Sequence, residues 1–294
     1  MKLVCLMENI SHRDDLQCQH GLSLYIETER HKILVDSGAN ALFAENAEVL
    51  GVDLSQVDIA VLSHGHYDHA GGLSRFLELN HTAKLYIKQE AFENYCHPIR
   101  KIIESETSSE EAYKYIGIDN VKLQTGSLTA KELKNHPQVV LVSGDMKIDE
   151  ELSLMTGITG RVCFPSTNHS LLVRTEDGYQ QDDFQHEQSL VISEGDKRVL
   201  ISGCAHCGIV NILNQYRKLY GEDPDVAVSG FHLERKNPYT KEQRAEVEQL
   251  AVELLNFKTK YDTCHCTGQE AFEILKDTLK NQMDYLSTGD VITI

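Results

Sequence analysis

The sequence lacks the features by which membrane, secreted and repeat proteins are recognised. Its 294 residues contain no apolar run of membrane-spanning length, and the N-terminus leads into a short strand pattern without a signal-peptide layout. No segment repeats with a fixed period, and no low-complexity stretch is long enough to mark a linker. We therefore expect a soluble, cytoplasmic protein that does not associate with a membrane.

Positive charge is also scarce. Lysine and arginine number 28 against 45 aspartate and glutamate residues, which gives a net charge of -17 at pH 7. This charge opposes attraction to nucleic acid phosphates, although metal cations can reverse the sign inside one cleft. We expect a small-molecule substrate and no nucleic acid partner. The eight cysteines are expected to be reduced, buried or close to a metal, because no secretion signal accompanies them.

The most informative segment contains three histidines and one aspartate within residues 64–69. It follows the apolar run 57–62, which predicts a strand. Three imidazoles and a carboxylate are costly to bury unless they bind something, and a divalent metal is the usual ligand. Alternation along an extended segment can point His64 and His66 to one side, whereas Asp68 and His69 face a second point. This spacing favours two adjacent metal ions.

The rest of the chain alternates between strand and helix patterns. A length of 294 residues is compatible with one large α/β domain. The pairing of Thr240 with Gln243, and of Thr267 with Glu270, predicts capping boxes at the starts of two helices. Strands are predicted over residues 22–27, 31–36, 57–62, 83–88, 189–193 and 198–202, and helices from about residue 72, over 209–219 and over 240–255.

Five segments carry a resemblance to a known family. Residues 63–73 resemble the H-x-H-x-D-H signature of the metallo-β-lactamase superfamily, and residues 35–38 resemble the aspartate-containing turn that precedes it. Residues 20–23, 202–206 and 264–268 resemble a subgroup labelled 7,8-dihydropterin-6-ylmethyl-4-(β-D-ribofuranosyl)aminobenzene 5′-phosphate synthase-like. The resemblance covers most of the chain. It implies one domain over residues 1–294, an αββα sandwich of two facing mixed sheets with helices outside.

The resemblance also implies a set of metal ligands. His206 and His265 each follow a predicted strand and precede a helix, at the sheet edge where sites of α/β folds gather. The cofactors implied are two divalent ions, zinc in the first place and manganese or iron as alternatives. One ion is assigned to His64, His66 and His206, and the other to Asp68, His69 and His265.

One feature departs from the superfamily pattern. Relatives place a Gly-Asp pair where the aspartate bridges both metals, whereas here Gly203 is followed by Cys204. The alternatives for the bridging ligand are Cys204, Asp145, His186 and no bridge at all.

Other polar residues have candidate roles in the reaction. Asp68 is a catalytic candidate, His186 is either catalytic or in contact with substrate or solvent, and His20 is a candidate for substrate contact. Asp36 is positioned to accept a hydrogen bond from a ligand imidazole. His232 is either a further site residue or a packing histidine.

The middle region, residues 91–183, has no regular pattern. Its acidic stretch 104–111 would ordinarily be a solvated surface. Because the region is inserted between the first metal motif and the later ones, we expect a cap over the site that selects the substrate.

The ligand set predicts a metal-dependent hydrolase. Zinc held by neutral imidazoles and a carboxylate lowers the pKa of bound water to about 7 and so supplies hydroxide. The expected reaction is hydrolysis of a small-molecule ester, lactone or phosphoester.

Other functions remain as alternatives. One is a pterin-type condensing synthase, although the sequence shows no glycine-rich phosphate loop or basic cluster. Others are an iron-dependent redox enzyme on the same fold and a noncatalytic metal-binding protein. A structural zinc site made by the thiols of residues 204, 207, 264 and 266 is a further reading.

Overall fold

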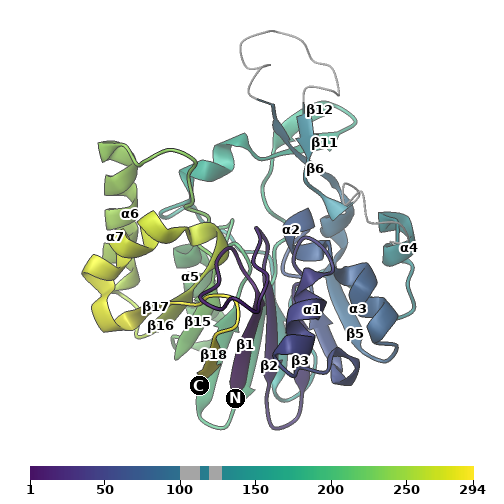
Figure 1. The fold of residues 1–294 in the computed structure, drawn as a ribbon. Helices are drawn as coiled ribbons and strands as arrows, with labels where there is room; N and C mark the ends of the chain where they lie inside the picture. Colours follow the sequence, from purple (N-terminus) through teal and green to yellow (C-terminus); the bar gives the residue numbers. More distant parts are fainter. Residues whose placement is uncertain (100–112, 119–127) are drawn as a thin grey trace.

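The computed structural model describes residues 1–99, 113–118 and 128–294, and it contains two mixed seven-stranded sheets. Figure 1 shows the two sheets next to each other, with one end of the strands of both sheets at the top of the view. The first sheet has the order β18-β1-β2-β3-β4-β5-β8, with β1 (Lys2–Met7), β2 (Ser23–Glu27), β3 (Lys32–Val35), β4 (Ile59–Val61), β5 (Lys84–Lys88), β8 (Val139–Val142) and β18 (Val291–Thr293). The second has the order β17-β16-β15-β14-β13-β10-β9, with β9 (Met146–Lys147), β10 (Leu152–Met155), β13 (Ser189–Glu194), β14 (Lys197–Ile201), β15 (Val226–Ser229), β16 (Lys260–Thr263) and β17 (Met283–Tyr285).

Helices cover the outer side of each sheet. On the first sheet these are α1 (Leu42–Val49), α3 (Leu73–Leu79) and α4 (Ala130–Lys134), and on the second α5 (Ile209–Tyr220), α6 (Lys241–Leu254) and α7 (Gln269–Leu279). The short helix α2 (Tyr67–Ala70) lies at the upper edge.

Alternation along the strands divides the core into three apolar layers. In β1, Leu3 and Cys5 pack between the sheets, whereas Val4 and Leu6 pack under α1 and α3. In β13, Leu190 enters the layer between the sheets, whereas Val191 packs in the layer beneath α5 and α6. Successive side chains of a strand point to opposite faces, so each sheet is apolar on both sides. The predicted αββα sandwich is confirmed.

The parallel strands place the candidate ligands at one edge. Strands β3, β4, β5 and β8 are parallel, and so are β14, β15, β16 and β17. Their carboxyl ends therefore meet at the upper edge, where α/β folds bind ligands. The residues that follow these strands there are Asp36, His64, Cys204, His232 and His265.

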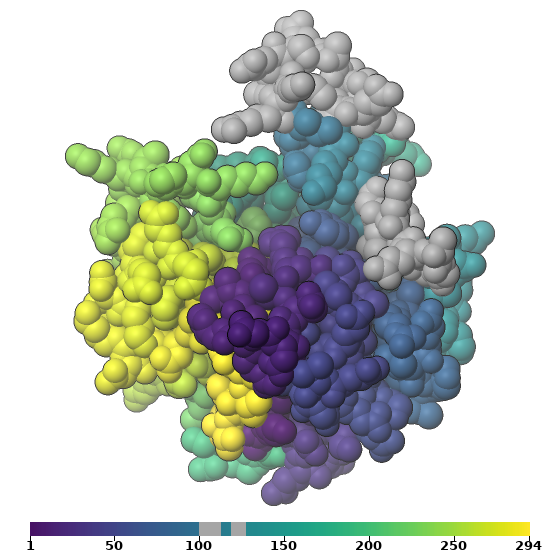
Figure 2. Space-filling model, in the orientation of Figure 1, coloured from purple at the N-terminus to yellow at the C-terminus, as the bar shows by residue number. Residues whose placement is uncertain are grey.

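The segment between β1 and β2, residues 8–22, connects the two halves at this edge. Asn9 contacts His265 of the second half, and His20 contacts Asp68 of the first. Figure 2 shows the N-terminal part of the chain, in purple, at the front of the molecule between the yellow C-terminal part and the blue part. The segment thus forms one wall of the site.

The middle region is shared between the core and a small separate sheet. Strands β8, β9 and β10 belong to the main sheets, whereas β6 (Asn94–Pro98), β7 (Tyr113–Tyr115), β11 (Leu172–Thr175) and β12 (Gly178–Gln181) form a four-stranded sheet in the order β12-β11-β6-β7 above the site edge. The backbone N–H of Tyr67 donates to the carbonyl of Ile116 at 2.8 Å, which attaches this sheet to the metal motif. The acidic stretch 104–111 lies outside the described residues.

One of the two predicted capping boxes forms and the other does not. Thr240 accepts from the N–H of Gln243, whose side chain reaches back to the N–H of Thr240. The prediction at Thr267 was wrong: in the described structure α7 begins at Gln269, and its N-cap is Gly268, without a side-chain cap. The Thr267 hydroxyl instead accepts from the N–H of Phe231 and contacts the hydroxyl of Thr263. Tertiary partners therefore replace the local cap.

None of the described helices combines the length and apolar character that crossing a bilayer would need. The eight cysteines are all free thiols, and five of them are buried around the site edge or between the sheets.

A histidine bridge joins the sheets at the end opposite the site. The ring of His31 contacts Asp58, before β4, and Asp149, before β10, each at 2.6 Å. Burial by itself lowers the pKa of His31, but the hydrogen bonds with both carboxylates outweigh it and the pKa is raised. Because the pKa of His31 is higher in the folded protein than in the unfolded chain, protonated His31 stabilises the fold. The whole of this stabilisation is present below the unfolded pKa of about 6.5, and it is lost as the pH rises through the folded pKa.

We therefore expect His31→Gln to lower the free energy of unfolding by on the order of 1 kcal/mol at pH 5.5 and by less at pH 9. Urea unfolding at the two pH values measures this difference. An equal decrease in the free energy of unfolding at both pH values would contradict a stabilising contact of protonated His31 with Asp58 and Asp149.

Candidate metal centre

Three histidine nitrogens converge at the first position. His64 Nε2 lies 3.1 Å from His66 Nδ1 and 3.3 Å from His206 Nε2, and all three rings are buried. Two nitrogens bound to one tetrahedral zinc at about 2.0–2.1 Å lie about 3.3 Å apart, so the spacing fits one such ion. The structure brings together the three residues that the sequence assigned to this ion.

Hydrogen bonds orient two of these rings. The Ser63 hydroxyl donates to Asp36 at 2.7 Å and lies 2.9 Å from His64 Nδ1. His206 Nδ1 lies 3.0 Å from the side-chain oxygen of Asn168. Each outer nitrogen therefore has an acceptor for its proton, which leaves Nε2 of both rings free to bind a cation.

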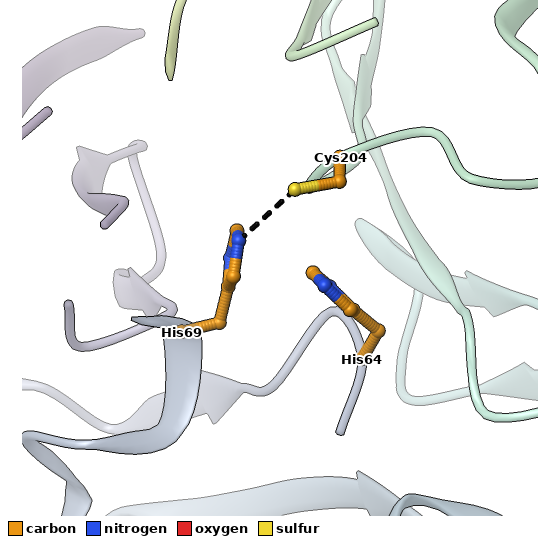
Figure 3. A group of neighbouring side chains, drawn as sticks. All are labelled: His64, His69 and Cys204. Carbon is orange, nitrogen blue, oxygen red and sulfur yellow. Dashed lines mark hydrogen bonds between the residues drawn. The ribbon is translucent and has the colours of Figure 1, made fainter. Parts of the chain in front are cut away.

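The second position gathers a carboxylate, two imidazoles and a thiol. Asp68 Oδ2 lies 3.3 Å from His265 Nε2 and 3.7 Å from His69 Nε2. Cys204 Sγ lies 3.1 Å from His69 Nε2, as Figure 3 shows, and His64 stands beside this pair. Asp68, His69 and His265 thus meet as the sequence predicted, and Cys204 is added to them.

Hydrogen bonds also orient the rings of His69 and His265 at the second position. His69 Nδ1 is 2.6 Å from Asp36, and His265 Nδ1 is 2.8 Å from the side-chain oxygen of Asn9. Asp36, predicted to accept from an imidazole, therefore serves His69 directly and His64 through Ser63.

The electrostatics keep the imidazoles of His64, His66, His206 and His265 neutral, whereas at His69 the charges of Asp36 and Asp68 outweigh burial and raise the pKa. Burial lowers the pKa of both His66 and His265 to about 3. The same cause, followed by neighbouring imidazoles, lowers the pKa of His64 and of His206 well below the ordinary value. Neutral imidazole is the form that binds a metal. Nε2 of His265, the nitrogen at the second position, is buried without a hydrogen-bond partner in the described residues. The donor set therefore fits divalent cations.

Asp68 supplies negative charge beside the rings of His69, His20 and His265. Its burial raises the pKa of the carboxyl, but neighbouring His69, His20 and His265 outweigh this and hold the pKa well below its usual range. The carboxylate also raises the pKa of His20 through their 3.1 Å contact, and His20 is half exposed. Asp68 is therefore ionised at neutral pH and links the buried site to the surface.

Two buried carboxylates, Glu187 and Glu8, hold the loops that contain His206 and His265. Neither of them was identified from the sequence. Glu187 accepts the backbone N–H groups of His206 and Cys207 at 2.7 and 2.9 Å. Glu8 accepts the N–H of His265 at 3.0 Å. His265 itself has φ of +50°, a strained conformation for a side-chain-bearing residue. The adjacent His186-Glu187 pair was the one local signal, and Glu8 carried none.

His186 and Asp145 occupy supporting places. His186 is fully buried: its Nδ1 accepts the N–H of Gly65 at 2.9 Å, and its Nε2 lies 3.1 Å from Asp182. Asp145 accepts from the N–H and hydroxyl of Thr156 and belongs to no candidate metal group in the described part of the chain. Of these alternatives, His186 shares a candidate group with His66 and Asp182, whereas Cys204 shares one with His64 and His69 and another with His265 and Cys266.

The alternative of a four-thiol zinc site is not formed. Cys204 and Cys266 share a candidate group with His265, but Cys207 and Cys264 join none within the described residues. The thiol of Cys207 points instead to the carbonyl of Phe184.

A pocket of about 490 Å³ opens onto these ligands. His20, His66, Asp68, His206 and His265 line its floor, and His232 lies beside them with Nδ1 2.9 Å from the Thr167 hydroxyl. Its size lies within the range of about 300–1,000 Å³ of small-molecule sites.

Three cations also line this pocket. Lys114 comes from β7, and Arg235 and Lys236 come from the segment after β15. The sequence shows no basic cluster because Lys114 is about 120 positions from Arg235 and Lys236; in the fold the three residues line one pocket.

Comparison with known proteins identifies the family. The model of the metallo-β-lactamase superfamily matches residues 17–182, more than half of the chain. The protein belongs to this superfamily, whose fold accounts for the αββα sandwich, and the clustered ligands agree with metal binding.

Individual relatives cover almost the whole chain. The chain is 24% identical to a 7,8-dihydropterin-6-methyl-4-(β-D-ribofuranosyl)-aminobenzene-5′-phosphate synthase of Methanocaldococcus jannaschii, over 99% of this chain and 96% of that protein. It is similar to a crystal structure described as a metal-dependent hydrolase of the β-lactamase superfamily, with a TM-score of 0.78, 25% identity and coverage of 100% and 99%. Zn²⁺-bound PqqB from Methylobacterium extorquens shares the fold, with a TM-score of 0.55, 10% identity and full coverage of both chains.

Proposed function

We propose that the protein is a metal-dependent hydrolase with two divalent ions, and that its substrate is a small phosphoester. The observation that carries the proposal is the convergence of buried imidazoles and one ionised carboxylate on a substrate-sized pocket. Zinc is the first choice of metal. Divalent ions bound there would supply Lewis acidity and make water a nucleophile near neutral pH.

The protein side chains would prepare both reactants. Asp68 contacts the ligand His265 on one side and the half-exposed His20 on the other. We assign Asp68 to orienting the attacking water and His20 to binding the substrate. His186 is assigned a positioning role, because its contact with the N–H of Gly65 fixes the turn between His64 and His66.

The cations at the pocket favour an anionic substrate over a neutral ester or lactone. Arg235 Nη2 donates to the Ser166 hydroxyl at 2.6 Å, so the guanidinium is held in place. Lys114 and Lys236 are exposed, and the Lys114 ammonium lies 5.4 Å from the centre of the Tyr67 ring. The pocket also contains the carboxylate of Glu234, which accepts a hydrogen bond from the side-chain amide of Asn9. In a chain of net charge -17, three cations at one pocket favour a phosphate group.

A screen of the zinc-loaded protein against phosphomonoesters, phosphodiesters, neutral esters and lactones tests the proposal. We expect hydrolysis of a phosphoester. We also expect Lys236→Met to raise KM for that phosphoester by up to about fivefold, since an exposed charge pair contributes up to about 1 kcal/mol. Lys241→Met, an exposed lysine outside the pocket, is the matched control and should change nothing. Hydrolysis confined to neutral esters or lactones would contradict the choice of substrate.

A condensing synthase is the second candidate. The 24% identity to the M. jannaschii synthase over almost the whole of both chains favours it, and the same cations could hold the 5′-phosphate that the name of that protein includes. Incubation with a dihydropterin and a ribofuranosylaminobenzene 5′-phosphate, followed by mass spectrometry, distinguishes the two. A coupled product without phosphoester hydrolysis would replace the hydrolase proposal. An iron-dependent redox reaction would be indicated by iron in the purified protein.

A further inference from the structure

We propose that the thiolate of Cys204 is a ligand of the second ion, so that the two metal positions differ in chemistry. The inference rests on the proposed two-ion site. The first position would be an all-imidazole site, and the second a sulfur-containing site that selects zinc over manganese.

The position of the thiol carries the argument. Cys204 Sγ lies 3.1 Å from His69 Nε2 and within 4.8 Å of the ligand nitrogens of both His64 and His69. It also belongs to a group with His265 and Cys266 whose donor atoms lie within the same distance of one another. His265 Nε2, fully buried and without a hydrogen-bond partner in the described residues, belongs to this group too. Cys204 Sγ therefore belongs to two candidate groups, one with His64 and His69 and one with His265 and Cys266.

The backbone around Cys204 is built for this placement. A Cβ on Gly203 would lie 2.1 Å from the Ser63 hydroxyl, so only glycine lets the end of β14 approach the metal motif this closely. On the other side, Ala205 has φ of +49°, and Glu187 holds the next two N–H groups. The loop is thus fixed on both sides of the thiol.

A second thiol supports the first. Cys266 Sγ lies 3.7 Å from the backbone carbonyl of Cys204 and is positioned to donate to it. A Cβ on Gly230 would lie 2.5 Å from this sulfur, so the absence of a side chain at Gly230 leaves room for Cys266. We assign Cys266 a positioning role for the Cys204 loop.

The donor chemistry gives the consequence for metal choice. Thiolates favour zinc, whereas manganese favours carboxylate and carbonyl oxygens. When the metal–sulfur bond forms, the Cys204 thiol loses its proton to solvent, and no oxidant or reductant takes part.

The test uses full-length protein reduced with a phosphine and loaded with two equivalents of Co²⁺. We expect the near-ultraviolet charge-transfer band of a cobalt–thiolate bond in the wild type, its loss in Cys204→Ser, and its retention in Cys207→Ser. Cys207 is a matched control because it is buried in the same loop and belongs to no candidate group in the described residues. The Kd for the second Zn²⁺ should rise in Cys204→Ser by more than the roughly 10–100-fold that loss of an outer partner costs.

A second variant keeps the test valid if Cys204→Ser fails to fold. Cys204→Asp should bind two ions without the charge-transfer band and should bind manganese more tightly than the wild type does. Absence of the band from wild-type protein that holds two cobalt ions would overturn the inference, as would a Cys204–Cys266 disulfide that persists under reductant. Hydrolysis by such a protein would leave the proposed function standing, whereas failure to bind any ion would overturn both.

Discussion

Replacing His66 with alanine should remove the metal from the first position and abolish hydrolysis. Its Nδ1 is one of the three nitrogens that converge there, and the ring is buried. A Lewis-acid contribution of several kcal/mol corresponds to a loss in kcat/KM of about 10³-fold or more. Metal analysis should show at least one ion fewer per chain, with the loss of metal and of activity occurring together.

The exposed His81 provides the control for this variant. His81→Ala should retain both the metal content and the activity of the wild type, since His81 lies on the surface and outside the candidate groups of the described residues. Circular dichroism would verify that His66→Ala is folded. A folded His66→Ala protein with full metal content and full activity would refute the assignment of the first position.

Asp68→Asn should keep the fold and lose most of the reaction rate. The amide has the same shape as the carboxylate but no charge, and it cannot replace the carboxylate that faces His265 and His20. A group that moves or orients a proton in the reaction is worth about 10²–10⁴-fold, and we expect kcat to fall within this range. The second ion should bind more weakly as well.

The pH response separates this variant from a merely unfolded one. Because Asp68 raises the pKa of His20, the pKa of His20 should fall in Asp68→Asn, and this is measurable by NMR in the metal-free protein. Asp196→Asn, in an exposed turn, is the control. An unchanged rate together with an unchanged His20 pKa would contradict the proposed role of Asp68.

The candidate ligands could be identified from the sequence because each lies in a local pattern. His64, His66, Asp68 and His69 are adjacent in the sequence, and their strand-end position is readable from the apolar run before them. His206 and His265 share that strand-to-helix context. Parallel strands end at the same edge, so the approach of these distant segments followed from the fold class.

The groups that support the ligands were not predictable in the same way. Glu8 and Asn9 act on His265 from more than 250 positions away in the sequence, and Asn168 acts on His206 from the middle region. No periodicity marks such partners, because their roles depend on which loops meet at the edge. At Thr267 a local pattern predicted a helix cap that does not form. Its hydroxyl instead makes tertiary hydrogen bonds with Thr263 and Phe231.

The most direct test of the two-ion site is a crystal structure of zinc-loaded protein with anomalous scattering recorded on either side of the zinc edge. The account predicts two anomalous peaks, one among the nitrogens of His64, His66 and His206 and one beside Asp68 and His265. Fully loaded protein with no peak among the three histidines would contradict it.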